Sequence, residues 1–205
     1  MVEQSIWMQK VAADPEHSHW YVERFRAMAR AGDDLAGEAR LVDAMAPRGS
    51  HILDAGCGPG RLGGYLATVG HRVVGVDVDP ALIEAAEQDY PGPRWLVGDL
   101  AELDLPARGI TEPFDVIVSA GNVMTFLAPG TRIQVLGRLR AHLGGDGRAV
   151  IGFGAGREYA FAQFLADAAA AGFAPDLLLS TWDLKPFADD SDFLVAVLRP
   201  ATAAG

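Results

Sequence analysis

Short apolar runs alternate with longer segments of helical periodicity along most of the chain. The apolar runs predict strands that are buried on both faces of a sheet, and the longer segments predict helices. We expect strands at residues 52–53, 72–77, 94–98, 114–119, 148–153, 177–184 and 192–199, with helices at 62–69, 81–89, 133–143 and 159–171. The last two strands are joined by a turn too short for a crossover helix, which favours antiparallel pairing. The pattern therefore predicts an α/β domain with a mostly parallel sheet.

Two more helices are predicted ahead of the first strand. Asp14-Pro15 supplies a cap and a first-turn proline for one of them, and Gly32 ends it. The apolar residues of this helix share one face: Tyr21, Phe25 and Met28. The second helix covers residues 35–45.

Composition and charge limit the function classes. The chain has 205 residues, of which 50% are hydrophobic, enough for one domain with a sizeable core. The formal net charge of -10 repels polyphosphate and anionic membranes. We therefore expect neither a nucleic-acid nor a membrane partner.

The cysteine and histidine content points to a cytoplasmic protein without a metal. Cys57 is the only cysteine, so no disulfide forms within the chain. The N-terminal segment lacks an export pattern, and no apolar run approaches the length of a membrane span. The histidines lack metal-ligand spacing and no Cys/His cluster is present, so no metal site is predicted.

A glycine-rich turn follows the first predicted strand. Gly56, Gly58 and Gly60 allow backbone torsions that other residues avoid and let a ligand approach the main chain. The helix after the turn directs its first amides, and the positive end of its dipole, toward the same place. We therefore expect the turn to hold a ligand that includes an anionic group.

The spacing of these glycines fits two cofactor classes. Counted from Gly58, the run to Gly63 matches the dinucleotide pattern G-x-G-x-x-G. Counted from Gly56, it is G-x-G-x-G with Asp54 two residues earlier. We favour the second count because Gly58 lies several residues past the strand and Pro59 restricts a tight turn there.

Residues 54–60, Asp-Ala-Gly-Cys-Gly-Pro-Gly, resemble the first motif of the class I S-adenosylmethionine-dependent methyltransferases, and the resemblance extends from Ile52 to the end of the chain. It implies a single Rossmann-like doubly wound domain over residues 48–200. The sheet of such a domain has seven strands and is mostly parallel, with an antiparallel last strand. The resemblance also implies an N-terminal helical lid over residues 1–47, and leaves a tail at residues 201–205.

Two further carboxylates follow predicted strands. Asp77 lies 17 residues after Gly60, where an acid in this architecture accepts hydrogen bonds from both ribose hydroxyls of an adenosine. It could instead cap the next helix, although Asp79-Pro80 already supplies a cap. Gly98-Asp99-Leu100 corresponds in the family to the adenine-binding motif, and the alternative is an ordinary turn aspartate.

Small residues after the fourth predicted strand leave backbone groups free beside the cofactor. In the family this edge faces the transferable methyl group. The run here, Ala120-Gly121-Asn122-Val123, lacks the Asn-Pro-Pro-Tyr type motif of amine-modifying nucleic-acid enzymes. The full set of predicted cofactor-binding residues is Tyr21, Asp54, Gly56, Cys57, Gly58, Gly60, Asp77, Val78, Asp99, Leu100, Ala120, Gly121 and Asn122.

Other side chains have both a functional and a structural interpretation. His19 and Tyr21 could close over the site, or serve only in packing. Cys57 could be a thiol activated by the helix N-terminus, or a small residue beneath the cofactor. His142 is interpreted as structural because a histidine suits the end of a helix. Three residues of the sixth strand could border the acceptor pocket: Trp182, Asp183 and Lys185.

The resemblance implies methyl transfer from S-adenosyl-L-methionine to a small-molecule acceptor. Because the sulfonium is already activated, the protein supplies mainly alignment and water exclusion. A general base is needed only if the acceptor must lose a proton, and no catalytic residue is predicted. Two alternatives stay open: an NAD(P)-dependent oxidoreductase, and a cofactor-binding module without turnover. The combined acidic and glycine positions argue against the second of these.

Overall fold

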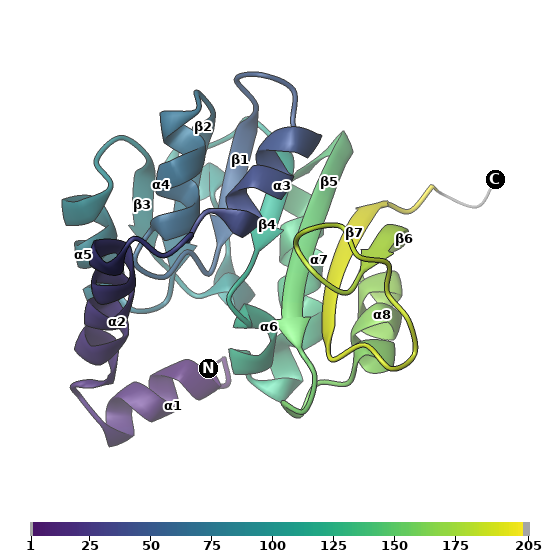
Figure 1. Ribbon diagram of the computed structural model, residues 1–205. Coiled ribbons are helices and arrows are strands. Elements are labelled where there is room, and N and C mark those ends of the chain that lie inside the picture. The colour runs from purple at the N-terminus through teal and green to yellow at the C-terminus, as the bar shows by residue number, and fades with distance from the viewer. Residues whose placement is uncertain (1, 203–205) are drawn as a thin grey trace.

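The computed structural model describes residues 2–202 and contains a seven-stranded sheet (Figure 1). The strands are β1 His51–Ala55, β2 Arg72–Asp77, β3 Arg94–Val97, β4 Phe114–Ser119, β5 Leu143–Gly154, β6 Phe173–Leu179 and β7 Phe193–Pro200. Their order is β3-β2-β1-β4-β5-β7-β6. β1 to β5 pair in parallel, whereas β7 is antiparallel to both of its neighbours, β5 and β6. The predicted Rossmann-like α/β fold is confirmed.

Helices cover both faces of the sheet. One face is covered by α3 Gly37–Met45, α4 Arg61–Thr68 and α5 Pro80–Asp89. The other is covered by α7 Arg132–His142 and α8 Phe161–Ala170. Three single turns of 3-10 helix lie in the connections: η1 Leu100–Glu102, η2 Pro106–Arg108 and η3 Pro129–Thr131.

Three further helices lie toward the carboxyl ends of the parallel strands: α1 Ile6–Ala13, α2 His17–Ala31 and the short α6 Val123–Phe126. α2 packs on α5, and α1 runs beneath the strand ends next to α6 (Figure 1). Trp7 and Val22 are buried against Leu82 and Ala85 of α5. The N-terminal helices are therefore anchored beside the edge at which ligands bind in open α/β sheets.

Side chains of β1 alternate between the two helical layers. Ile52 faces α3 and α4, while Leu53 and Ala55 belong to the larger core with α7. Since both faces are covered, all five residues of the strand are buried. Asp54 is the polar exception, and it lies on the same side as Ile52, toward α4.

The N-terminal helices differ from the prediction. Asp14 does not begin a helix; it ends α1, which was not predicted, and α2 begins at His17. The residue before a proline is driven out of the helical region, and Asp14 has φ -140° and ψ 97°. Gly32 ends α2 as predicted, with φ 82°.

Two predicted boundaries near the C-terminus were wrong. Leu143 begins β5 rather than ending the preceding helix, because it pairs with Phe114 of β4. Within this helix Ile133 is exposed, whereas Val135 is buried. The sixth strand runs from Phe173 to Leu179 instead of over residues 177–184.

That shift removes Trp182, Asp183 and Lys185 from the strand. Trp182 covers Gly152 of β5, whose added Cβ would lie 2.3 Å from the indole ring. Asp183 and Lys185 are exposed, with 3.9 Å between their charged groups. None of the three lines the cavities described below.

In residues 2–202 no helix has both the length and the apolar character needed to cross a membrane. Of the predicted tail, residues 203–205 lie outside the described part of the chain. Ala201 donates its amide hydrogen to the carbonyl of Gly172, 2.8 Å away.

Candidate active site

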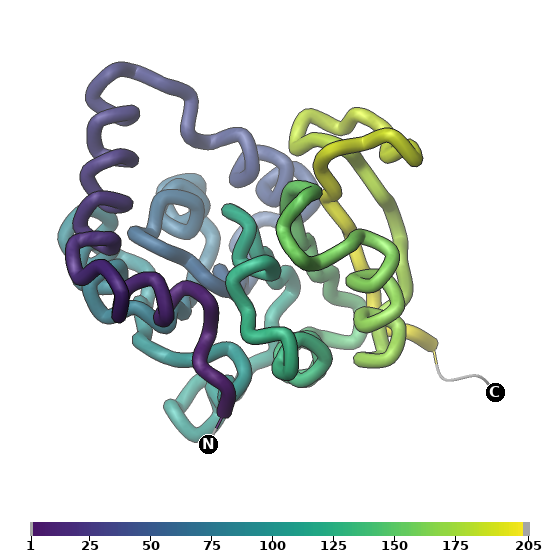
Figure 2. The backbone as a smooth tube through the Cα atoms, turned by 90° about the horizontal axis from the view of Figure 1, so that it is seen from below, coloured from purple at the N-terminus to yellow at the C-terminus, as the bar shows by residue number. Residues whose placement is uncertain are grey.

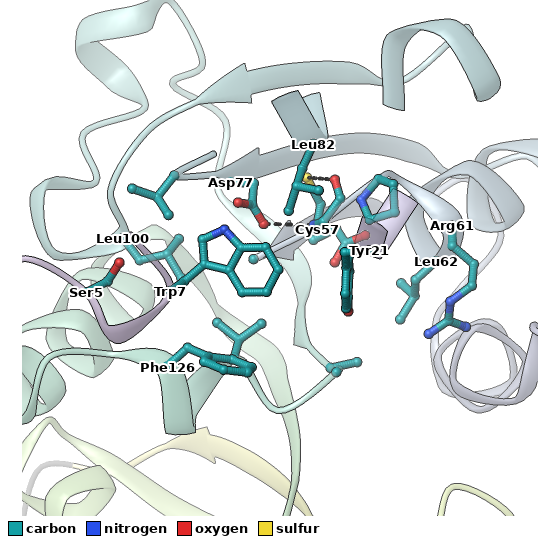
Figure 3. Close-up of a pocket in the computed structure, with 18 of the residues that line it drawn as sticks. Ser5, Trp7, Tyr21, Cys57, Arg61, Leu62, Asp77, Leu82, Leu100 and Phe126 are labelled. Carbon is teal, nitrogen blue, oxygen red and sulfur yellow. Dashed lines mark hydrogen bonds between the residues drawn. The ribbon is translucent and has the colours of Figure 1, made fainter. Parts of the chain in front are cut away.

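A cavity lies at the carboxyl ends of β1, β2 and β4, and we call it the inner cavity (Figure 3). It encloses about 890 Å³ of empty space including its open mouth. The predicted cofactor-binding residues on its wall are Tyr21, Asp54, Gly56, Cys57, Gly58, Asp77, Val78, Asp99, Leu100, Ala120 and Gly121. Gly60 and Asn122 are absent from this wall, and so is His19, which is exposed on α2.

Asp54 fills part of the place where an anionic ligand was expected. Its Oδ2 accepts a hydrogen bond of 2.9 Å from the amide of Gly63, in the first turn of α4. The side chain is 2% exposed, and burial raises its pKa to about 7. The positive end of this helix therefore faces a carboxyl group of the protein itself.

Asp77 connects the end of β2 to the glycine turn. Its Oδ2 accepts from the amide of Gly58 at 2.8 Å, and its Oδ1 accepts from the amide of Asp79 at 3.0 Å. Burial raises the pKa of Asp77 to about 6, against the effect of these two hydrogen bonds. Asp79, not Asp77, caps α5, since its Oδ1 accepts from the amide of Ala81.

Asp99 caps a turn and also lines the inner cavity. Its Oδ1 caps η1 by accepting from the amide of Ala101 at 2.8 Å, as a turn aspartate does. No partner for Oδ2 lies within the described residues, and the side chain also lines the inner cavity. Leu100 beside it is buried and forms an apolar part of the wall.

The glycines of the turn are required for different reasons. Gly56 has φ 79°, and a Cβ there would lie 2.4 Å from Val123. Gly58 has φ 53° and faces the cavity. Gly60 has φ 82°, and its Cβ would lie 2.8 Å from Ala86 of α5. Gly60 therefore permits helix packing, whereas the other two shape the cavity wall.

The thiol of Cys57 is not activated. Its side chain is buried against Ile83, Ala86 and Trp95. This burial, together with the nearby carboxylates of Asp54 and Asp77, raises its pKa well above the usual value. This burial argues against the reactive-thiol interpretation and favours a small packing residue at this position.

Trp7 and Phe126, which were not predicted as site residues, form an aromatic wall with the predicted Tyr21. The Trp7 ring lies 5.2 Å from Tyr21 and 5.6 Å from Phe126, measured between centroids (Figure 3). Trp7 lies on α1. The sequence signal for this helix is its N-cap residue Ser5, whose hydroxyl accepts a hydrogen bond from the Met8 amide at 3.2 Å. Residues from α1, α2 and α6 thus meet over the cavity.

Tyr21 lies between two parts of the site. A Cβ on Gly58 would be 3.8 Å from its ring, and one on Gly121 would be 3.9 Å from its hydroxyl. Burial raises the pKa of Tyr21, so the phenol stays protonated at neutral pH. The side chain therefore reaches from the glycine turn to the loop after β4.

A second hollow, the outer cavity, adjoins the first. Both are lined by Trp7, Tyr21, Phe25, Arg61, Gly121 and Phe126. Asn122 lines the outer cavity, and its Oδ1 accepts from the amide of Gly154 at 2.8 Å. His142 lines neither cavity; its Nε2 accepts from the amide of Leu105, and its Nδ1 lies 2.7 Å from the carbonyl of Arg138. This arrangement agrees with a structural role for His142.

The fold is that of a Rossmann-like α/β protein, and Asp54, Asp77 and Asp99 line one cavity at the carboxyl ends of its parallel strands. Comparison with known proteins gives the family. Residues 52–147 match the family described as "Methyltransferase domain". A solved structure of a TehB-like SAM-dependent methyltransferase from Corynebacterium glutamicum is 54% identical, with a TM-score of 0.86 over 91% of this chain and 100% of that one.

Two sequence relatives are more distant. Magnesium-protoporphyrin O-methyltransferase from Rhodobacter capsulatus is 31% identical over 163 residues, which are 76% of this chain and 65% of that protein. An 18S rRNA (guanine-N(7))-methyltransferase from Mus musculus is 43% identical over 54 residues, 26% of this chain and 19% of that protein. The chain thus spans less than two thirds of the length of these relatives. Together with the solved structure, they show that the chain belongs to the class I S-adenosylmethionine-dependent methyltransferases.

Proposed function

We propose that this protein transfers the methyl group of S-adenosylmethionine to a small-molecule acceptor. The supporting observation is the pair of buried carboxyl groups, Asp54 and Asp77, whose pKa values burial raises to about 7 and about 6. A buried carboxylate gains most from a ligand that brings positive charge and hydrogen-bond donors. S-adenosylmethionine carries an ammonium group, a sulfonium, ribose hydroxyls and an adenine amine, so the residues present fit it.

Each carboxylate is assigned a different part of this molecule. We assign the ribose hydroxyls to Asp77, at the end of β2, and the adenine amine to Asp99, whose Oδ2 is without a partner in the described chain. Asp54, beside the first turn of α4, is assigned to the cationic amino acid end. Val78, Leu82 and Leu100 supply apolar surface for the base.

The protein's contribution to the reaction is alignment and exclusion of water. When S-adenosylmethionine is bound, it supplies a methyl group that the acceptor's nucleophilic atom attacks; the sulfur–methyl bond breaks, its electron pair stays on sulfur, and an acceptor proton passes to solvent. Trp7, Tyr21 and Phe126 form the aromatic boundary that keeps water from the inner cavity. Residues 1–47, which carry two of these rings, act as a lid.

The charge of the chain favours a small molecule as the acceptor. The net charge of -10 opposes binding to a nucleic acid, although one relative is named for an rRNA substrate. We further propose a cytoplasmic location, consistent with one buried cysteine and no disulfide among the described residues.

Calorimetric titration with S-adenosylmethionine, S-adenosylhomocysteine and NADH tests the cofactor. We expect both nucleosides to bind and NADH not to bind. Asp77→Asn and Asp99→Asn weaken binding by about tenfold or more, because each loses charge-assisted hydrogen bonds. The matched control Asp176→Asn changes an exposed carboxylate of β6 and leaves the affinity unchanged. Binding of NADH alone would instead support an oxidoreductase.

Turnover needs its own measurement, since a cofactor-binding module would pass the titration. Release of S-adenosylhomocysteine is followed across a panel of small acceptors. Acceptor-dependent release supports the enzyme. Tight cofactor binding without release for any acceptor would favour the module.

A further inference from the structure

The outer cavity has a distinct set of charges. Its lining residues include members of α1, α2 and the loop between β5 and α8. Figure 2 shows the backbone of these segments from below. Its basic lining residues are Lys10 on α1, Arg24 on α2, Arg157 in the loop, and Arg61. Its volume of about 460 Å³ is enough for a second small molecule beside the cofactor.

The carboxylates on this wall are already neutralised. Glu38 holds both terminal nitrogens of Arg61 at 2.8 Å, and Asp34 holds Arg40 in the same two-pronged way. These ion pairs lower the pKa of both carboxyl groups, so they stay ionised and engaged. They are therefore unable to offset additional positive charge around the cavity.

The remaining basic side chains of the wall have no such partner. The side-chain nitrogens of Lys10, Arg24 and Arg157 form no ion pair or hydrogen bond with any residue between 2 and 202. The other basic side chains without one are Arg138, Arg140 and Arg148, on α7 and β5, and none of them lines either cavity. In a chain of net charge -10, this is a local excess of positive charge at the site's entrance.

Flat aromatic rings stand beside these cations. Trp20 is 56% exposed and stacks only on His17, at 5.8 Å between centroids. The guanidinium of Arg24 lies 5.9 Å from the ring centres of both Trp20 and Phe25. Tyr21 completes the wall on the side of the inner cavity. Such a wall suits a planar molecule that carries an anionic group.

We infer that the outer cavity is the acceptor site and that it takes a small aromatic carboxylate. This inference rests on the proposed methyl transfer. The carboxylate is held by Arg24 and Arg157, with Lys10 adding to the attraction. The aromatic ring lies against Trp20 and Phe25, so that the end of the acceptor opposite the carboxylate faces Tyr21 and the inner cavity.

The test compares two probes of the same shape, 4-hydroxybenzoate and its neutral amide, 4-hydroxybenzamide. Binding is measured by calorimetry to the full chain, both free and saturated with S-adenosylhomocysteine. We expect the carboxylate to bind at least about tenfold more tightly than the amide, and this preference to shrink at high salt. Arg24→Gln and Arg157→Gln should each weaken carboxylate binding about five- to tenfold and leave amide binding unchanged.

Arg138→Gln is the matched control, because Arg138 is an exposed arginine that lines neither cavity. Equal affinity for the two probes, binding of neither, or an equal loss with Arg138→Gln would overturn the inference. Failure of the proposed function has a different signature, namely no binding of S-adenosylhomocysteine to wild type. Because the probes are also titrated into the free protein, the acceptor inference is tested in either case.

Discussion

At the residue scale, burial raises the pKa of Asp54 to about 7, and we expect binding of the proposed cofactor to depend on pH as a result. Its pKa of about 7 in the free protein means that the carboxylate is about 90% ionised at pH 8 and about 10% at pH 6. A cationic ligand binds the ionised form and releases the proton. We therefore expect the affinity for S-adenosylmethionine to fall by about tenfold or more between pH 8 and pH 6, as measured by calorimetry.

Asp54→Asn provides the comparison. An asparagine keeps an oxygen for the Gly63 amide but cannot titrate, so the variant binds more weakly at pH 8 and loses less affinity on acidification. The pH dependence left in the variant belongs to Asp77, whose pKa is about 6. An unchanged wild-type affinity from pH 6 to pH 8 would contradict this account.

Gly56 permits a separate test of the cavity wall. Gly56→Ala places a Cβ 2.4 Å from Val123 at a φ of 79°, so it combines overpacking with backbone strain. We expect the free energy of unfolding, measured by chemical denaturation, to fall by about 2–4 kcal/mol. Gly70→Ala is the control: φ is 98° but no atom lies within 4 Å, so strain alone should cost about 1–2 kcal/mol. Equal losses in the two variants would show that the contact with Val123 is unimportant.

At the scale of elements, Asp79 holds the two N-terminal helices to α5. Its Oδ2 accepts from Nε1 of Trp7 at 2.8 Å and from the hydroxyl of Ser18, while its Oδ1 caps α5. Since Asp79 is 2% exposed, these bonds lie out of contact with water. One carboxylate thus connects α1, α2 and α5 beside the inner cavity, which Trp7 also lines.

Asp79→Asn should loosen the lid without unfolding the core. The asparagine oxygen can still cap α5. The amide NH2 group that replaces Oδ2 is a donor and cannot accept the hydrogen bonds from Trp7 and Ser18. We expect faster hydrogen exchange over residues 6–31 than in wild type, unchanged exchange in β1 and β4, and weaker binding of S-adenosylmethionine. Ser18→Ala removes one of the two hydrogen bonds to Oδ2. It should therefore lower the free energy of local opening over residues 6–31 by a smaller amount, about 1 kcal/mol. Unchanged exchange over residues 6–31 would rule out this coupling.

The elements that the sequence predicts well are those whose pattern is local. β2 and β4 match the predicted bounds to the residue, because each is an apolar run that is buried on both faces. α1 was missed because eight residues show little periodicity, and its capping by Ser5 was the only clear signal. β6 was misplaced because it is an edge strand with exposed residues at 175–177, so no continuous apolar run marks it.

Some parts of the site are likewise set by local sequence, and others depend on how distant segments pack. Asp54, Asp77 and Asp99 lie at or just after the ends of predicted parallel strands. Because the carboxyl ends of parallel strands meet at one edge of a sheet, the sequence predicts that these three side chains lie close together. The aromatic wall depends on how α1 and α2 fold back over that edge. Trp7 and Asp79 are 72 residues apart in the chain, so no local pattern connects them. Gly60 has the predicted conformation but serves packing with α5 instead of lining the cavity.

For the whole molecule, the buried carboxyl groups reverse the usual effect of pH on stability. Asp54 and Asp77 have raised pKa values in the folded chain, about 7 and about 6, against 3.8 in the unfolded chain. A raised pKa means that the folded state binds protons more tightly. Their stabilising contribution is therefore complete below about pH 4 and is lost as pH rises through 6 and 7.

Other carboxyl groups also titrate in this pH range, so the contribution of Asp54 is isolated by comparing wild type with Asp54→Asn. The free energy of unfolding of wild type minus that of Asp54→Asn should fall by about 2–3 kcal/mol between pH 5 and pH 8, measured by chemical denaturation without cofactor. Saturating S-adenosylmethionine should remove this fall or reverse its sign, because the ligand's positive charge favours the ionised carboxylate. A difference that is independent of pH without cofactor would contradict the raised pKa of Asp54. A difference that keeps the same slope with and without the cofactor would show that Asp54 does not face the cationic end of the ligand.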